Sequence, residues 1–131
     1  MNSIMNYVDN KTTDSVTYNT TPSTIISVTI TTTGAPVLIG AAGDANPLNP
    51  GGWCVLTLAR DGIPIGKRIQ CESSASNENV PYNLQYIDTP DAGTYTYSLV
   101  LLYLPTTDFY FQFGEQGGPY MFALEIGRAH V

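Results

Sequence analysis

Apolar and polar residues alternate with a period of two through most of the chain, and this pattern predicts β-strands. No stretch shows the 3.6-residue apolar stripe of an amphipathic helix. Clusters of Gly, Pro, Asn and Asp separate the alternating segments. The predicted strands are 24–32, 36–42, 53–60, 63–70, 80–88, 94–104, 109–113 and 120–125. The pattern therefore predicts an all-β chain.

The even spacing of these segments predicts an antiparallel, jelly-roll-like β-sandwich of about eight strands. Asp61-Gly62 predicts a tight hairpin, because a type I′ turn needs positive φ at both central positions. An immunoglobulin-like sandwich is the alternative, since Asp91–Tyr95 has the D-x-G-x-Y pattern of a tyrosine corner. The residues expected to face the core are Leu56, Leu58, Leu84, Tyr97, Leu99 and Leu101.

Three regions differ in pattern. Residues 1–23 are polar without alternation, which is typical of a neck or attachment segment that is partly disordered when alone. Residues 24–125 form the predicted sandwich, with a turn-rich loop over 43–52. Ile126–Val131 matches the translation of a common sequencing adapter, so we interpret these six residues as read-through and expect the true C-terminus to lie further on.

Charge argues against two classes of partner. The chain has five Lys and Arg against eleven Asp and Glu, a formal charge of −6, and only Lys67 and Arg68 are adjacent. Nucleic-acid binding needs clustered basic residues, which this sequence lacks. No apolar run reaches the length of a membrane span, and the N-terminus lacks the basic and apolar regions of a signal peptide. We therefore expect neither nucleic-acid binding nor membrane insertion.

The two cysteines, Cys54 and Cys71, flank the predicted Asp61-Gly62 turn at nearly equal distances. A cross-strand disulfide is possible if a bulge shifts the register. The alternative is two reduced, buried thiols that act as small hydrophobic groups. A closed zinc site is not expected, because these cysteines and His130 cannot complete a tetrahedral ligand set.

Two groups of oxygen-bearing side chains are candidates for an ion site or a carboxylate pair: Asp44, Asn46 and Asn49, and Asp88, Asp91 and Asp108. The first group has calcium-ligand chemistry, but turn formation accounts for it equally well. The second lies at strand ends and turns, where Asp binds backbone N–H groups. The sequence has neither G-x-S-x-G nor a phosphate-binding loop, so we expect no enzyme, no metal and no cofactor.

Aromatic residues are the remaining candidates, because a ring offers an apolar face with a polar edge or tip. Trp53, Tyr86 and Tyr110 lie where they could form ligand platforms. Tyr110, Tyr120 and Phe122 belong to late strands richer in aromatics than one small core requires, which indicates an interface between chains. Most of the other aromatics are expected to pack in the core.

A resemblance covers roughly residues 35–125 and is carried by turns and hairpins. The matching segments are Gly43–Pro47, Leu58–Gly66, Asn79–Tyr82, Asp88–Pro90, Ala92–Tyr95 and Ala123–Glu125. They resemble modules of bacteriophage tail-fibre and virion-surface proteins, which are similar to the jelly-roll heads of the tumour-necrosis-factor and C1q type. Such heads form trimers.

The resemblance implies a homotrimeric module at the surface of a phage particle, made in the host cytoplasm without a signal peptide. Its task would be fibre assembly or binding to a host surface glycan or protein. Two alternatives remain open: a carbohydrate-binding module of a bacterial secreted protein, and a capsid decoration protein.

Overall fold

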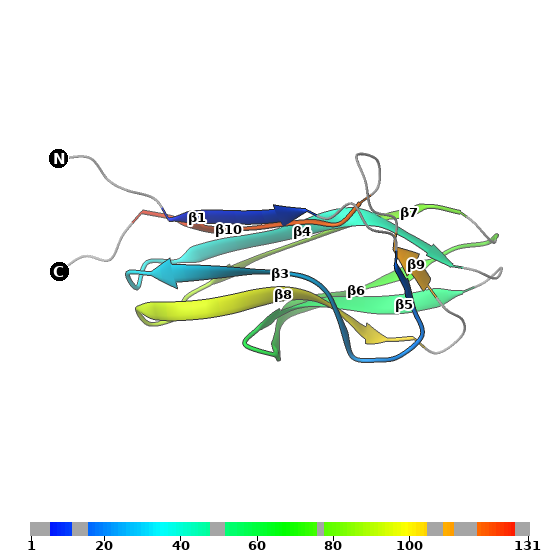
Figure 1. Ribbon diagram of the computed structural model, residues 1–131, viewed down its shortest axis with the longest axis horizontal. Coiled ribbons are helices and arrows are strands. Elements are labelled where there is room, and N and C mark those ends of the chain that lie inside the picture. Colours follow the sequence, from blue (N-terminus) through cyan, green and yellow to red (C-terminus); the bar gives the residue numbers. More distant parts are fainter. Residues whose placement is uncertain are drawn as a thin grey trace.

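The computed structural model describes residues 6–11, 16–47, 52–75, 78–104, 109–111 and 118–127. These residues form two facing antiparallel β-sheets and no helix (Figure 1). The ten strands are β1 (Tyr7–Lys11), β2 (Val16–Tyr18), β3 (Ser23–Thr32), β4 (Val37–Pro47), β5 (Trp53–Arg60), β6 (Ile63–Glu72), β7 (Val80–Asp88), β8 (Gly93–Tyr103), β9 (Phe109–Phe111) and β10 (Tyr120–Glu125).

The strands pair as one long hairpin folded over on itself. Strand β1 pairs with β10, β2 with β9, β3 with β8, β4 with β7 and β5 with β6. The hairpin turns at Asp61-Gly62, where φ is 49° and 84° as a type I′ turn requires. Pairs β3·β8 and β5·β6 lie in one sheet, and β4·β7 lies in the other. This alternation is the wrapping of a jelly roll, so the predicted fold is confirmed.

We call the two sheets A and B. Sheet A has the order β1-β10-β4-β9-β2, with β7 on the other edge of β4, and sheet B has the order β3-β8-β5-β6. The core fills the space between them. All six predicted core residues are at most 4% exposed, so that prediction is confirmed. Five of them lie in sheet B and Leu84 lies on β7 of sheet A. Sheet A also contributes the buried side chains of Val37, Ile39, Ala41, Ala45, Met121 and Ala123.

The predicted loop over residues 43–47 is wrong, because these residues extend β4. Through Ala45, β4 pairs with β7, and from Ala45 to Pro47 its other edge pairs with β9. The backbone hydrogen bonds of these two ladders hold this segment in a strand, although its residue types favour turns. The predicted strand over 109–113 is seen for Phe109–Phe111, and residues 112–113 lie outside the described ranges.

The boundary predicted between a neck (1–23) and a sandwich (24–125) does not match the strand assignment. Residues 7–11 and 16–18 form β1 and β2, which pair with β10 and β9 within sheet A. Tyr7 and Val8 already show the alternation of an edge strand, with Val8 packed against the core. At the other end, Ile126 donates its N–H to the Pro36 carbonyl at 2.7 Å, and residues 128–131 lie outside the described ranges.

The tyrosine corner exists without an immunoglobulin strand order. The Tyr95 hydroxyl donates to the Asp91 carbonyl at 2.7 Å, as the D-x-G-x-Y pattern requires. The Arg60 guanidinium lies 5.5 Å from the Tyr95 ring centroid and 2.7 Å from the Asp88 carboxylate. Asp88, which is 7% exposed, also accepts a hydrogen bond from the Tyr97 hydroxyl at 2.7 Å. These contacts join the end of β7 to β5 and β8.

A buried carboxylate that the sequence analysis did not single out joins β10 to the chain near β1 and β4. Glu125 has no exposed surface. It accepts hydrogen bonds from Asn6 Nδ2 (2.8 Å), from Thr33 N and Oγ1 (2.7 and 2.9 Å), and from Ala35 N (3.2 Å). Burial by itself would raise the pKa of Glu125, but the hydrogen bonds from Thr33, Asn6 and Ala35 outweigh it and hold the pKa below its ordinary value.

We expect Glu125→Gln to lower the free energy of unfolding at neutral pH by about 2 kcal/mol, because an amide cannot accept from all of these donors. Since the pKa of the folded carboxyl is depressed, its stabilisation is present above the ordinary pKa of 4.5 and is lost as the pH falls through the folded value. Urea unfolding of both chains from pH 7 to pH 3 checks this. If the difference in unfolding free energy between the unmodified chain and Glu125→Gln stays constant over that range, the expectation is contradicted.

We expect Leu99→Ala to lower the free energy of unfolding by roughly 2–5 kcal/mol, because it leaves a cavity between the sheets. Leu99 has no exposed surface and lies between its partners Ile26 and Leu58 on adjacent strands. Urea unfolding measures the change, and Thr24→Ala on the exposed side of β3 is the control. If both substitutions lowered the free energy of unfolding equally, Leu99 would not be a core residue.

Candidate functional site

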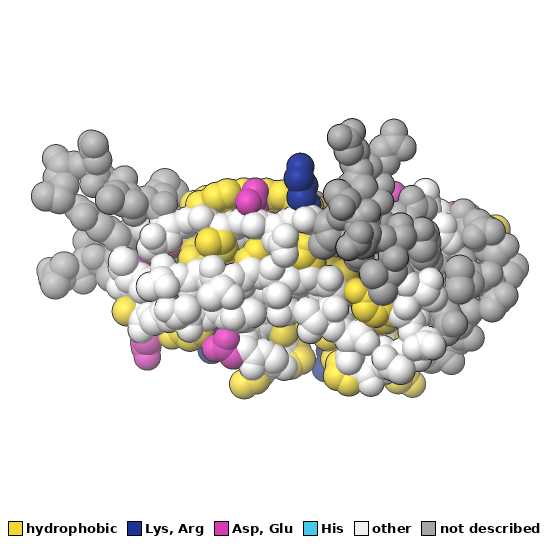
Figure 2. Space-filling view, in the orientation of Figure 1, with side chains coloured by type: hydrophobic (Ala, Val, Ile, Leu, Met, Phe, Trp, Pro, Cys, Tyr) yellow, Lys and Arg dark blue, Asp and Glu magenta, His cyan; other side chains and the backbone are white. Residues whose placement is uncertain are grey.

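The outer face of sheet A is largely apolar. The strand register places its outward side chains in three rows across β1, β10, β4 and β7. The rows are Tyr7, Leu124, Leu38 and Ile87; Asp9, Phe122, Gly40 and Gln85; and Lys11, Tyr120, Ala42 and Asn83. Tyr7 is 50% exposed and Ile87 is 55% exposed. Hydrophobic side chains lie along the rim where Figure 1 places β1 and β10 (Figure 2).

Two glycines of β4 allow aromatic rings to lie against the sheet. A Cβ on Gly40 would lie 2.4 Å from the Phe122 ring, which therefore covers Gly40 on the outer face. A Cβ on Gly43 would lie 2.5 Å from the Tyr82 hydroxyl. Each ring belongs to the residue directly opposite its glycine on the neighbouring strand. An aromatic ring that covers a strand glycine restores the packing that the missing side chain would have supplied.

The outer side of strands β3 and β8 in sheet B has the opposite chemistry. Its β3 and β8 side chains pair as hydroxyls, with Thr29 2.9 Å from Thr96 and Thr31 2.8 Å from Thr94. The Cα partner of Ser27 is Ser98. The four threonine hydroxyls bond to one another across the two strands. This part of sheet B is therefore more polar than the outer face of sheet A, although Ile63 and Tyr103 elsewhere in sheet B are exposed.

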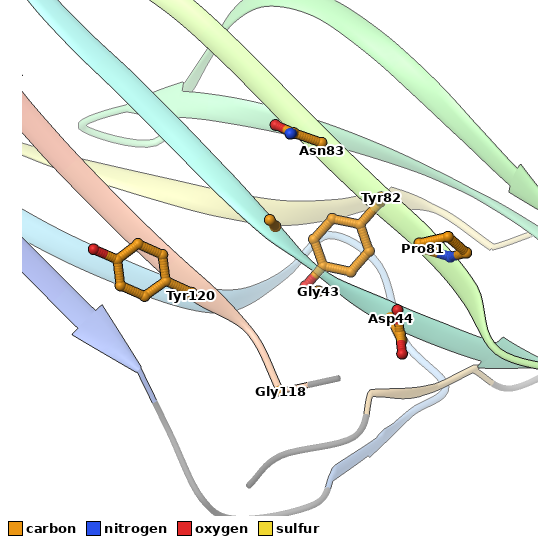
Figure 3. Close-up of a pocket in the computed structure, with 8 residues that line it drawn as sticks. Gly43, Asp44, Pro81, Tyr82, Asn83, Gly118 and Tyr120 are labelled. Atoms are coloured by element: carbon orange, nitrogen blue, oxygen red, sulfur yellow. The ribbon is translucent and has the colours of Figure 1, made fainter. Parts of the chain in front are cut away.

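A depression of about 520 Å³ opens in sheet A where β4 changes partner. One edge of β4 pairs with β10 as far as Ala42 and with β9 from Ala45. Among the described residues, no strand pairs with Gly43 and Asp44 on that edge. The depression is lined by Ala42, Gly43, Asp44, Pro81, Tyr82, Asn83, Gly118 and Tyr120 (Figure 3). Its position follows from the strand register.

The depression combines an aromatic ring with polar groups of three kinds. The Tyr120 ring is half-buried, Asp44 supplies a carboxylate, and Asn83 supplies an exposed amide. Tyr82 extends from β7 towards Gly43 of β4 and is 4% exposed (Figure 3). Burial raises the pKa of the Tyr82 phenol, so its hydroxyl stays protonated and keeps its ability to donate. A carboxylate accepts hydrogen bonds, while an amide both donates and accepts them.

A hydrogen-bonded network holds Tyr120 in position. The Tyr120 and Tyr7 hydroxyls lie 2.8 Å apart, and both lie within hydrogen-bonding distance of Asp9 Oδ2, at 3.3 and 3.1 Å, so two phenol protons are shared among three contacts. The bond with Tyr120, then desolvation and the Asp9 carboxylate, raise the pKa of Tyr7, so this phenol is neutral at pH 7. The Tyr120 and Phe122 ring centroids are 6.3 Å apart. These contacts fix the ring at the side of the depression.

The three residues predicted as ligand platforms do not form one site. Trp53 lies in sheet B, half-buried, with its ring 5.8 Å from that of Tyr103. Tyr86 lies on β7 in sheet A, where its ring packs over Gly66 of β6. Tyr110 lies on β9, and its side chain is outside the described residues. Of the predicted interface residues, Tyr120 and Phe122 lie on the outer face of sheet A; their role in an interface stays a prediction.

The structure gives Cys54 and Cys71 as free thiols directly opposite each other on β5 and β6. The disulfide that the spacing allowed stays a prediction, and the bulge that it required lies between Leu56 and Leu58. Within the described ranges, no three His, Cys, Asp or Glu side chains cluster as metal ligands. Asp44 is half-buried on β4, and Asn46 is buried with its amide 2.9 Å from Asn79 Oδ1.

The sequence pattern did not bring Asp44, Asn83, Tyr82 and Tyr120 together: Asp44 was a candidate calcium ligand, Tyr120 an aromatic candidate for an interface, and Asn83 no candidate at all. Asp44 was placed in a loop, and Tyr82 was expected in the core. The signal that could have found them is Gly43, because a glycine inside a strand marks a bulge or a close approach of another group. How Gly43 lies relative to Asn83 depends on the register between β4 and β7, and the alternation of residues within a single strand does not give that register.

No family model and no curated protein sequence matches this chain. Its fold is similar to that of the Eiger TNF of S. frugiperda, at a TM-score of 0.52 and 11% identity over 98% of this chain and 96% of the other. It is also similar to the CBM36-1 domain of a multidomain xylanase from the hindgut metagenome of Trinervitermes trinervoides. That match has a TM-score of 0.50 and 13% identity over 95% of this chain and 99% of the other. At such identities the likeness establishes a common jelly-roll sandwich.

The described residues contain no helix long and apolar enough to cross a membrane.

Proposed function

We propose that this chain is a non-catalytic carbohydrate-binding module whose ligand occupies the depression in sheet A. The observation that carries the proposal is a concave site that combines the Tyr120 ring with the Asp44 carboxylate and the Asn83 amide. Its size falls within the range of small-ligand sites, which run from about 300 to 1,000 Å³.

The side chains match the chemistry of a sugar ring. A pyranose has an apolar face of C–H groups, which packs against an aromatic ring, and a rim of hydroxyls, which donate and accept hydrogen bonds. Tyr120 supplies the ring, Asp44 accepts from hydroxyls, and Asn83 can do both. The depression is open, so a sugar unit within a longer chain could enter it sideways. The fold that this chain shares with a carbohydrate-binding module supports the proposal.

We expect the chain to migrate more slowly in native gels cast with a soluble polysaccharide that it binds; xylan, galactan and a bacterial O-polysaccharide are the probes. Tyr120→Ala should weaken binding by about tenfold or more, because the ring face is lost. Tyr120→Phe keeps the ring and should bind more tightly than Tyr120→Ala. Thr94→Ala, on the outer face of sheet B, is the matched control.

Two outcomes contradict the site. One is unchanged migration of the unmodified chain in all three polysaccharides. The other is equal binding by Tyr120→Ala and Thr94→Ala.

A second function, self-association, is favoured by the apolar outer face of sheet A. Tyr7, Ile87 and Phe122 lie on this face beside only a few charged residues, whereas β3 and β8 of sheet B present paired hydroxyls. Large exposed apolar patches usually mark interfaces. The jelly-roll heads that the sequence resembles form trimers, so we propose a homotrimer held by this face. The rows that start at Tyr7 and Asp9 would form the contact, and the depression at the third row would stay open to a ligand.

We expect light scattering on a gel-filtration peak to give three chain masses, against 14.2 kDa for a monomer. Ile87→Glu should shift the peak to the monomer, because it buries a charge in the contact. Ile63→Glu is the matched control, since Ile63 is 69% exposed but lies on β6 of sheet B. A monomer mass for the unmodified chain at tens of micromolar contradicts the trimer.

The placement on a phage particle, as a tail-fibre or virion-surface module that binds the host envelope, rests on the resemblance of turn and hairpin segments. It stays a prediction, and so do assembly in the host cytoplasm and the role of capsid decoration. A trimer that also binds a bacterial O-polysaccharide would favour the particle surface. A monomer that binds only plant polysaccharides would favour a module of a secreted enzyme.

A further inference from the structure

The thiols of Cys54 and Cys71 face each other at the edge of sheet B. Among the strands that the structure describes, β6 is the last of that sheet and pairs only with β5. Cys71 is the only buried side chain on β6, where most other side chains are exposed. Cys54 has no exposed surface, and Cys71 is 2% exposed. The edge strand is thus joined to the core by this thiol pair, by the partly buried side chains of Ile65 and Ile69, and by its ladder with β5.

The geometry suits a covalent bond between the two sulfurs. Cys54 and Cys71 are direct partners in the antiparallel register. Direct partners in such a ladder have Cα atoms roughly 4.5–5.5 Å apart, and disulfides span Cα distances of about 4.4–6.8 Å. Both side chains point to the same side of the sheet, as direct partners must. Their closeness also appears in a hydrogen bond between the thiols.

We propose that Cys54 and Cys71 are an oxidation site, at which a small disulfide such as oxidised glutathione converts the thiol pair into a cross-strand disulfide that fixes β6 to β5. The Cys71 sulfur attacks one sulfur of the oxidant and releases one glutathione. The Cys54 sulfur then attacks the mixed disulfide and releases the second glutathione. The two thiol protons end on the two glutathiones, so the chain loses two electrons and the oxidant gains them.

Acidity favours this order of attack. The hydrogen bond from Cys54 lowers the pKa of Cys71, whereas the pKa of Cys54 is raised by the same bond and by burial. A thiolate is the attacking species in disulfide exchange. Because both sulfurs are buried, the oxidant reaches them only when β6 opens from β5. Edge strands open more easily than central ones, since they are bonded on one side alone.

The bond would act on the sandwich beyond β6. Trp53 and Glu72 are the next pair in the same ladder, and the half-buried Trp53 ring lies beside the Tyr103 ring. On the core side, the two thiols lie close enough to the Tyr82 hydroxyl to affect its pKa. Tyr82 also covers Gly43 at the depression. Fixing β6 therefore constrains both the edge of sheet B and the core beneath the depression, whether or not a sugar binds there.

Peptide mapping tests whether the bond forms. The full chain is incubated with oxidised glutathione, alkylated in denaturant and digested with trypsin without reduction. Arg60, Lys67 and Arg68 lie between the two cysteines, so cleavage separates them unless a disulfide joins the peptides. We expect one linked species of residues 12–60 and 69–128, two hydrogens lighter than the two thiol peptides together. Two alkylated cysteines, or a glutathione adduct that never resolves, overturns the proposal.

Thermal unfolding tests the effect on β6. The oxidised chain should melt about 10 °C above the reduced chain, because the cross-link closes a loop of moderate length. The double variant Cys54→Ala and Cys71→Ala is the control and should melt at one temperature with or without oxidant. A linked chain that melts at or below the reduced one overturns the claim that the bond fixes β6. If the melting temperature of the double variant rises equally with oxidant, the rise comes from the oxidant and not from a disulfide, and the claim is overturned.

Discussion

The fold depends on the register that is set at the Asp61-Gly62 turn. Because the strands are nested around this turn, every later pair follows the β5·β6 pair outward along the same long hairpin. Asp61 also ties the turn to β8: its N–H donates to the Thr96 carbonyl and its carboxylate accepts from the Thr96 N–H, both at 2.8 Å. A slip of one residue would turn every inward side chain outward. One strand register therefore decides both which side chains face the core and which face outward.

The same register gives the sandwich two unlike outer faces. On sheet B it pairs threonine with threonine, and on sheet A it aligns Tyr7 with leucine and isoleucine side chains. Gly40 and Gly43 have no side chain, so the Phe122 ring lies over Gly40 on the outer face and Tyr82 lies over Gly43 on the core side. The depression opens at the residues where β4 leaves β10 and has not yet met β9. Carbohydrate binding and self-association are thus proposed for neighbouring parts of one face.

The strands were predictable because the alternation of a half-buried strand is a local property. Trp53–Arg60, Val80–Asp88 and Tyr120–Glu125 have the bounds that the pattern predicted. The errors have a common physical reason: residues 43–47 and β1 are strands because of their partners, and residue type alone indicated a turn and a neck. Glu125 and the depression escaped notice likewise, since both depend on residues far apart in the sequence that only the folded sandwich brings together.

We propose that both ligand binding and self-association take place on the outer face of sheet A. Hydroxyl-radical footprinting with mass spectrometry tests it most directly, by comparing side-chain oxidation in dilute chain with oxidation in concentrated chain and with added polysaccharide. The account predicts protection of Tyr7, Ile87 and Phe122 on concentration and of Tyr120 on ligand binding, while Ile63 and Tyr103 of sheet B stay reactive. Protection confined to Ile63 and Tyr103, or oxidation that is the same in all three samples, would contradict it.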